Sequence, residues 1–296
     1  MKIKAFFLFI FCSVLLFCSC EKPALDEDIK GTGTADDKFN ITFNIKRFEQ
    51  VPFYDAVKYA RSADIKQLCT RINFAVFNED TKVASVNQSV SDKDFGKIAV
   101  SLPAGNYRFV VIAHNCTGNA TVTNLSKIKF PNNKVTDTFY CCEEIAVDAA
   151  ASYQLELRRC VAQFKLIVED AIPEEVTKMK FVYTGGSSTF DAVNGVGSVN
   201  SHQTEERNIT NSQRSGNAEF GIYTFPHVKD DVLKISIMAL NSSNTVLKDL
   251  QLENVPVNMN KITPYKKAFF STSVDTKNNT FSFVINDEWG ITEYAY

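Results

Sequence analysis

The chain has 296 residues, which is enough for about two domains of ordinary size. Hydrophobic residues make up 45% of it and charged residues 22%, so a buried core is expected and disorder throughout the chain is excluded. The formal net charge of -2 and the pI of about 6.0 exclude the strongly basic balance that is typical of nucleic-acid-binding proteins.

The amino terminus has the pattern of an export signal. Two lysines precede an apolar run over residues 5–17, which suits a signal peptide and is shorter than the roughly 20 residues of a membrane-spanning helix. Cys20 follows the small residue Ser19, and this pair resembles the lipobox of bacterial lipoproteins. We therefore predict a signal peptide over residues 1–19 and a lipid on Cys20. The alternative is an uncleaved membrane anchor with a coincidental cysteine.

The stretch that follows the predicted lipid site, residues 20–37, is mostly polar and is expected to act as a flexible tether. It carries the acidic residues Asp26, Glu27 and Asp28. An acidic stretch in this place resembles the surface-export signal of Bacteroidetes lipoproteins, and an ordinary solvated linker is the alternative.

Alternation of apolar and polar residues predicts strands along the rest of the chain, each with one face in a core and one in water. The 24 Phe and 10 Tyr agree with this, because aromatic rings pack well on a pleated surface. The alternating segments are residues 39–45, 72–76, 107–113, 153–157, 162–168, 233–239 and 281–285. Helical spacing is limited to a loose stripe over residues 55–69 and one turn at Glu174-Glu175. These patterns predict an all-β fold of the β-sandwich type.

A domain junction is expected near Arg158-Arg159. The run over residues 152–170 would extend for about 60 Å, which is too long for one ordinary strand. We therefore predict one sandwich over residues 38–158 and a second over residues 159–296. Residues 185–216 are rich in Gly, Ser, Asn and Thr, which predicts a long loop or hairpin. A mobile surface loop is favoured over a recognition loop there.

Cysteine chemistry beyond the lipid site is expected to be structural. Five cysteines remain, an odd number that leaves at least one unpaired in a monomer. No CxxC spacing occurs, so we expect small buried apolar side chains, and disulfide formation stays an open question. The five are Cys69, Cys116, Cys141, Cys142 and Cys160.

Catalytic and metal-binding patterns do not stand out. The histidines are His114, His202 and His227, and none has a partner at metal-ligand spacing. We interpret His114 as structural, since it ends a predicted strand. Asp230-Asp231, Asp92 and Asp94 are interpreted as solvated turns in preference to calcium ligands. The prediction is a protein without catalytic residues, cofactor or metal.

Several segments in series resemble the FimB-type family of fimbrial anchor lipoproteins of Bacteroidales. They are VSLPAGNYRFVVIAH (100–114), LELRRCVAQFKL (155–166), DAIP (170–173), KFVYTGG (180–186), LENVPVNMNKIT (252–263) and INDEW (285–289). The resemblance implies two tandem transthyretin-like, Ig-like Greek-key sandwiches and no enzymatic activity or cofactor. It also implies an outer-membrane lipoprotein, facing the cell exterior, that holds the base of a fimbria and limits its length.

The resemblance further implies stalk fimbrillin subunits as partners, joined by strand exchange at a sheet edge. Only seven residues follow Trp289, which favours a terminal subunit over a stalk subunit. Arg47, Arg61 and Arg71 could instead be maturation sites of a stalk subunit. The alternative function is a lipid-anchored surface adhesin or glycan-binding protein without a pilus, with a host or bacterial surface ligand.

Overall fold

The computed structural model describes residues 37–48, 64–228 and 230–271, and these are almost entirely β-structure. Seven strands form a first sandwich: β1 (Lys38–Phe48), β2 (Arg71–Asn78), β3 (Thr81–Ser89), β4 (Lys97–Pro103), β5 (Gly105–His114), β7 (Thr138–Val147) and β8 (Ala151–Arg159). Seven more form a second: β9 (Ala162–Val168), β10 (Lys178–Thr184), β13 (Gln203–Asn208), β14 (Ala218–Thr224), β15 (Asp230–Leu240), β16 (Val246–Asn258) and β17 (Ile262–Lys267). The predicted all-β class is confirmed.

The remaining elements are short. A small sheet has the order β12-β11-β6, and its members are β6 (Ile128–Lys129), β11 (Thr189–Asp191) and β12 (Val196–Gly197). Within the described ranges, helical structure is limited to α1 (Ile65–Leu68) and two 3-10 turns, Pro131–Asn133 and Asn211–Gln213. Among the residues described, no helix is long and apolar enough to cross a bilayer.

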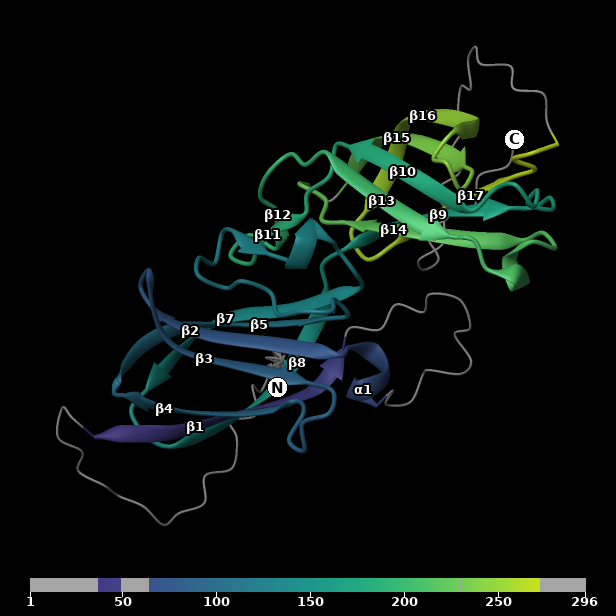
Figure 1. The fold of residues 1–296 in the computed structure, drawn as a ribbon. Coiled ribbons are helices and arrows are strands. Elements are labelled where there is room, and N and C mark those ends of the chain that lie inside the picture. The colour runs from purple at the N-terminus through teal and green to yellow at the C-terminus, as the bar shows by residue number, and fades with distance from the viewer. Residues whose placement is uncertain (1–36, 49–63, 229, 272–296) are drawn as a thin grey trace, which may run out of the picture. The chain divides into compact units, whose positions relative to one another are not determined.

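Both sandwiches have the same connectivity. In the first, β4-β1-β8 packs against β3-β2-β5-β7, and a short pairing of β7 with β8 joins the two layers at one corner (Figure 1). In the second, β14-β9-β17 packs against β13-β10-β15-β16. The first strand of each sandwich runs antiparallel to one neighbour and parallel to the last strand, in the pairs β1 with β8 and β9 with β17.

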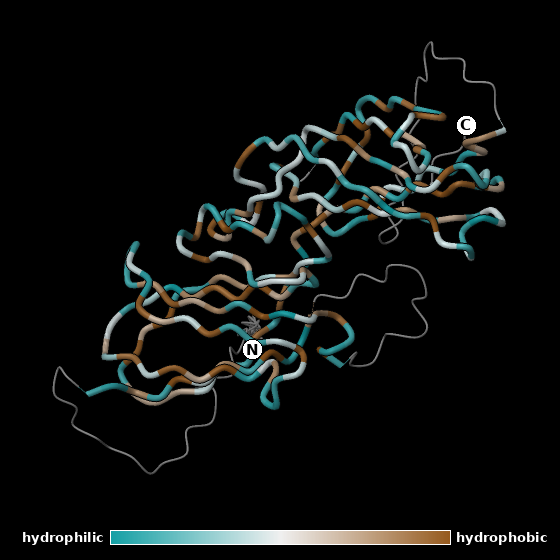
Figure 2. The backbone as a smooth tube through the Cα atoms, in the orientation of Figure 1, coloured by the Kyte–Doolittle hydropathy of each residue, from teal (hydrophilic) through white to brown (hydrophobic). Residues whose placement is uncertain are grey.

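The predicted alternation places the expected side chains in the two sandwich cores. Ile41 and Phe43 of β1 have no exposed surface, and the Phe43 ring centroid lies 4.8 Å from those of both Phe74 and Phe109. The apolar stretches follow the strands, and polar residues gather at the turns between them (Figure 2). A turn precedes β5, and the Tyr107 hydroxyl closes it by donating to the Pro103 carbonyl at 3.0 Å.

The prediction that each strand has one face in water is wrong for β2 and β5. Val110 and Ile112 are fully buried, as are their neighbours Phe109 and Val111 on the opposite face. A third apolar cluster covers this outer face, and it joins side chains of both sandwiches, including Phe77 of β2. The unbroken apolar run over residues 109–113 is the signal of a strand buried on both faces.

The preference for a mobile loop over residues 185–216 is also wrong, whereas the hairpin alternative is met in part, because β11 and β12 pair antiparallel. This stretch contains β11, β12 and β13, and β11 pairs with β6 through Thr189 and Phe190. Its Ser-rich composition provides local hydrogen bonds: the buried Ser187 hydroxyl donates to the Thr189 carbonyl at 2.7 Å and accepts from the Thr189 N–H at 3.1 Å. Its glycines permit close approach, since a Cβ at Gly197 would lie 2.6 Å from the Phe225 carbonyl oxygen.

Other expectations are met in part or lie outside the described residues. The helical stripe over residues 55–69 yields only α1 in the described part, and the turn at Glu174-Glu175 is present. The signal peptide, Cys20, the tether and the strand expected over residues 281–285 lie outside the described residues. Strand β8 ends at Arg159 and β9 begins at Ala162. The domain boundaries themselves stay a prediction.

Candidate assembly site

The two outermost strands of the first sandwich, β3 and β4, lie at opposite ends of the seven-stranded order. Each has one side without a strand partner in the described part of the chain. Such edges expose backbone N–H and C=O groups that can pair with a strand from another protein. The sequence-based expectation of assembly at a sheet edge therefore has two candidate strands here.

The seam between β3 and β4 is closed at one end. The Gln88 side chain, near the end of β3, donates to the carbonyls of Asp94 and Lys97 at 3.1 and 2.8 Å and accepts from the Gly96 N–H at 2.9 Å. At this end, β3 and β4 are therefore joined by the Gln88 side-chain amide and not by backbone hydrogen bonds between the two strands. Toward the other end of the seam, no strand of the described part of the chain pairs with the outer side of β3 or β4.

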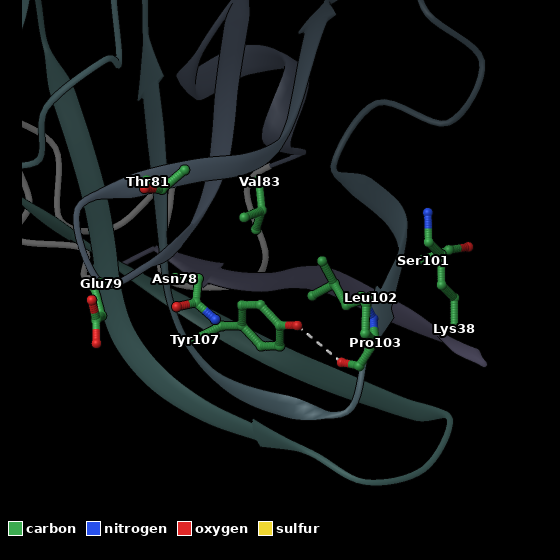
Figure 3. Close-up of a pocket in the computed structure, with 9 residues that line it drawn as sticks. All are labelled: Lys38, Asn78, Glu79, Thr81, Val83, Ser101, Leu102, Pro103 and Tyr107. Carbon is green, nitrogen blue, oxygen red and sulfur yellow. Dashed lines mark hydrogen bonds between the residues drawn. The ribbon is translucent and has the colours of Figure 1, made fainter. Parts of the chain in front are cut away.

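At that other end lies an open hollow of about 470 Å³ (Figure 3). Figure 3 shows the Tyr107 ring between the turn that carries Asn78 and Glu79 and the strand that carries Leu102 and Pro103. The hollow is lined by Lys38, Asn78, Glu79, Thr81, Val83, Ser101, Leu102, Pro103 and Tyr107. It is thus formed by both edge strands, by the beginning of β1 and by β5.

The lining combines an apolar floor with a polar rim. Leu102 and Tyr107 are 2% and 6% exposed, whereas Val83 on the β3 edge is 46% exposed. Lys38 and Glu79 place one positive and one negative charge on the exposed rim. An apolar floor beside free backbone groups suits an extended peptide, whose side chains cover the floor while its main chain pairs with the edge.

Comparison with protein families places the chain among fimbrial proteins. Residues 35–294 match the family described as fimbrillin-A associated anchor proteins Mfa1 and Mfa2. The chain belongs to this family. The fimbrial anchor resemblance found in the sequence is thereby confirmed, and membership gives the chain a fimbrial anchor or adhesin role at the cell surface, with fimbrial subunits as partners.

Solved structures with a similar fold include fimbrial and adhesin proteins at low sequence identity. A candidate adhesin from Bacteroides ovatus is 15% identical, with a TM-score of 0.48, and covers 81% of this chain and 94% of that chain. The fimbrial anchor protein Mfa2 from Porphyromonas gingivalis is 10% identical, with a TM-score of 0.40, and covers 74% and 83%. The tip fimbrial protein Mfa3 from the same organism is 8% identical, with a TM-score of 0.39, and covers 87% and 98%. Among curated proteins, no significant match to the sequence is found.

In this member of the anchor family, His114 is a buried structural residue. Its Nδ1 accepts from the Cys116 N–H at 3.1 Å, so the ring proton is on Nε2, which donates to the Asn73 Oδ1 at 2.8 Å. Asn73 also accepts from the Ala120 N–H at 2.9 Å. Burial, with a smaller effect of the nearby Arg71 charge, lowers the pKa of His114 to about 4. The ring is therefore neutral and ties the end of β5 to the following loop.

The other histidine and aspartate candidates do not converge on a site. Asp231 Oδ2 accepts from the backbone N–H and from Nδ1 of His227, at 2.9 and 3.0 Å, which orders the turn before β15. Asp92 accepts from the Ser89 N–H at 2.9 Å in the turn after β3, and the Asp94 carbonyl accepts from the Gln88 side chain in that turn. His202 is exposed. The part of the chain that the structure describes contains no group of three or more His, Cys, Asp or Glu residues placed to hold a metal ion.

The five cysteines are free thiols in the structure. Four are buried and Cys142 is half-buried. Burial raises the pKa of Cys69 and of Cys141 to about 12 and that of Cys142 to about 11. The pKa values of Cys116 and Cys160 are raised for the same reason. Since thiolates are the reactive form, these side chains act as small core residues.

The hollow itself was missed by sequence reasoning. Pro103 and Gly105 favour a turn between β4 and β5, but nothing in the sequence pairs that turn with Val83 or with Lys38. Residues 81–89 alternate weakly, with Val83 and Val86 at odd spacing among polar neighbours. The only available signal was that a short strand flanked by turns often lies at an edge, where apolar residues can remain exposed.

Proposed function

We propose that this chain is the lipid-anchored base subunit of a fimbria. A lipid on Cys20 holds the amino terminus in the outer membrane, and the tether over residues 20–37 places the two sandwiches outside the cell. The family match over residues 35–294 is the observation that carries the proposal. The apolar run, the Ser19-Cys20 pair and the polar tether support the lipid-anchored location.

Attachment of the fimbria is proposed to occur at the hollow between β3 and β4. An extended segment of a fimbrial subunit pairs with a free edge there, and its apolar side chains cover Leu102 and Tyr107. The combination of unpaired edges and a buried apolar floor supports this mode of binding. The protein then works by binding and retention, without catalysis and without a cofactor.

The lipid anchor is tested with Cys20→Ala, using Cys18→Ala as the matched control in the same segment. Cys20→Ala should move the protein from the membrane fraction to the soluble fraction and remove the acyl mass from its first peptide. Cys18→Ala should leave both properties unchanged. Membrane retention with an intact acyl mass in Cys20→Ala would contradict the proposed attachment point.

The proposed binding site is tested with Val83→Lys. A charge on an edge strand opposes the addition of another strand, and this position is exposed, so the fold should be retained. Val193→Lys is the control, because Val193 is equally exposed at 46% and lies outside the hollow. Fimbrial subunits should be recovered with the wild-type and Val193→Lys proteins and lost with Val83→Lys. Equal recovery with all three would place the partner elsewhere.

A further inference from the structure

We propose that β1 is a mechanical clamp that lets this chain carry a pulling load along its amino-terminal tether. Within the first sandwich, β1 is the central strand of the layer β4-β1-β8. It pairs with β4 over Lys38–Asn44 and with β8 over Ile41–Phe48. Extracting β1 along its axis therefore requires two ladders to break together. The proposal rests on the proposed function only in assuming that load enters through the tether.

The direction of the pulling force decides how the two strand ladders resist the extraction of β1. The tether enters β1 at Lys38, and the chain leaves the sandwich at Arg159, the end of β8. Because β1 and β8 are parallel, these two points lie at opposite ends of the pair. Tension between them slides the strands past each other, so all hydrogen bonds of the ladder share the load. In a hairpin pulled from its open end, the bonds break one after another.

Side chains on β1 reinforce the hydrogen bonds. The fully buried Phe43 ring lies 4.8 Å from the rings of Phe74 and Phe109 and 5.4 Å from that of Tyr153. Sliding β1 would drag Phe43 and Ile41 out of these contacts into water, which costs apolar burial in addition to the broken ladder.

The far end of the clamp is held at the junction between the sandwiches. Arg159 donates to both carboxylate oxygens of Asp137, at 2.7 and 3.0 Å, and to Asn260 Oδ1 at 3.2 Å. Its guanidinium also lies 4.6 Å from the centre of the Phe139 ring. These contacts hold Arg159, the last residue of β8, against Asp137 just before β7 and against Asn260 in the loop before β17. The side-chain contacts of Arg159 therefore bear part of the force transmitted through β8 before it reaches β9.

The second sandwich repeats the arrangement. Its first strand, β9, is central in β14-β9-β17, antiparallel to β14 and parallel to β17, the last strand among the described residues. Tension applied between Lys38 and Lys267 consequently loads a parallel pair of strands in each sandwich.

Single-molecule pulling tests the clamp in one protein with two handle positions. The chain from Glu21 onward is held by its amino terminus and pulled either from the carboxyl terminus or from a label on Ala104→Cys. Ala104 is exposed beside Pro103, which pairs with Lys38, so the second geometry peels β1 from β4 starting at one end. Four of the five native thiols are buried, Cys142 is half-buried, and burial raises the pKa of all five, so a reagent at neutral pH should label position 104 in preference to them.

The weakest unfolding event in the end-to-end geometry should need more force than the first event in the peeling geometry at equal loading rate, because sheared bonds share the load and peeled bonds break one after another. In the end-to-end geometry, unfolding of the first sandwich over Lys38–Arg159 releases roughly 120 residues, about 400 Å of chain, whereas the peeling geometry releases only the segment between Lys38 and position 104, roughly 65 residues or about 220 Å. Equal rupture forces in the two geometries would overturn the clamp. Since neither geometry involves the lipid or a partner, failure here is distinct from failure of the Cys20 and Val83 tests.

Discussion

Substitution of Phe190 by alanine tests whether the stretch over residues 185–216 is part of a core shared by the two sandwiches. Phe190 lies on β11, has no exposed surface and belongs to the third apolar cluster. Its ring centroid lies 4.8 Å from that of Tyr140, on β7 of the first sandwich, and 5.0 Å from that of Phe225, just after β14 of the second. The substitution therefore removes contacts to both sides at once.

The expected cost follows from burial and ring contacts. Truncation of a buried Phe to Ala costs about 3–5 kcal/mol, because apolar burial is lost and a cavity remains. The two aromatic neighbours place the expected destabilisation toward the upper end of this range, since each ring pair contributes roughly 0.5–1.5 kcal/mol beyond area burial. At about 2–4 °C per kcal/mol for a protein of this size, the Tm should fall by roughly 10–15 °C.

Urea and thermal unfolding, followed by circular dichroism on the unlipidated chain, measure this loss. Val193→Ala is the control, because Val193 lies in the same segment, follows β11 by two residues and is 46% exposed. That variant should stay within about 0.5 kcal/mol of the wild type. A loss below about 1 kcal/mol for Phe190→Ala would mean that the segment is not an integral part of the core, and the reasoning would fail.

Two further predictions concern titration and thiol reactivity. The folded-state pKa of His114, about 4, lies below its ordinary value of 6.5, so the unfolded chain takes up the proton first as the pH falls. Its contribution to stability is present above pH 6.5 and should fall by about 2 kcal/mol by pH 5, as measured by urea midpoints at pH 7 and 5. His114→Gln should flatten this part of the profile, and an unchanged slope would refute the assignment. The five native thiols should not react with a disulfide reagent at pH 8 until urea unfolds the chain, when all five should react. Rapid labelling of the folded protein would contradict their burial.

The strands were predictable where the sequence signal is local. Residues 39–45 and 153–157 alternate clearly, because each strand has a core face that requires apolar side chains at every second position. The turn before β5 was predictable from Pro103 and Gly105, whose backbone preferences suit it. The end of β8 near Arg159 followed from strand length alone.

The rest depends on pairing between distant parts of the chain. Thr189 of β11 pairs with Lys129 of β6, and the sequence pattern within either segment does not predict that contact. The apolar run over residues 109–113 indicated that both faces of β5 are buried, but neither the segments that cover its outer face nor the hollow beside Val83 could be foreseen. Polar composition over residues 185–216 suggested solvent, but there the hydroxyl of Ser187 satisfies buried backbone groups.

The shared third cluster has a practical consequence for dissecting the protein. Cutting the chain after Arg159 would separate Phe190 and Phe225 from Phe77, Val110 and Ile112, which are now fully or almost fully buried. Each half would then expose an apolar surface to solvent, and such surfaces promote aggregation. The two sandwiches are therefore best produced together, because binding assays on isolated halves would measure non-specific association through the exposed apolar surface.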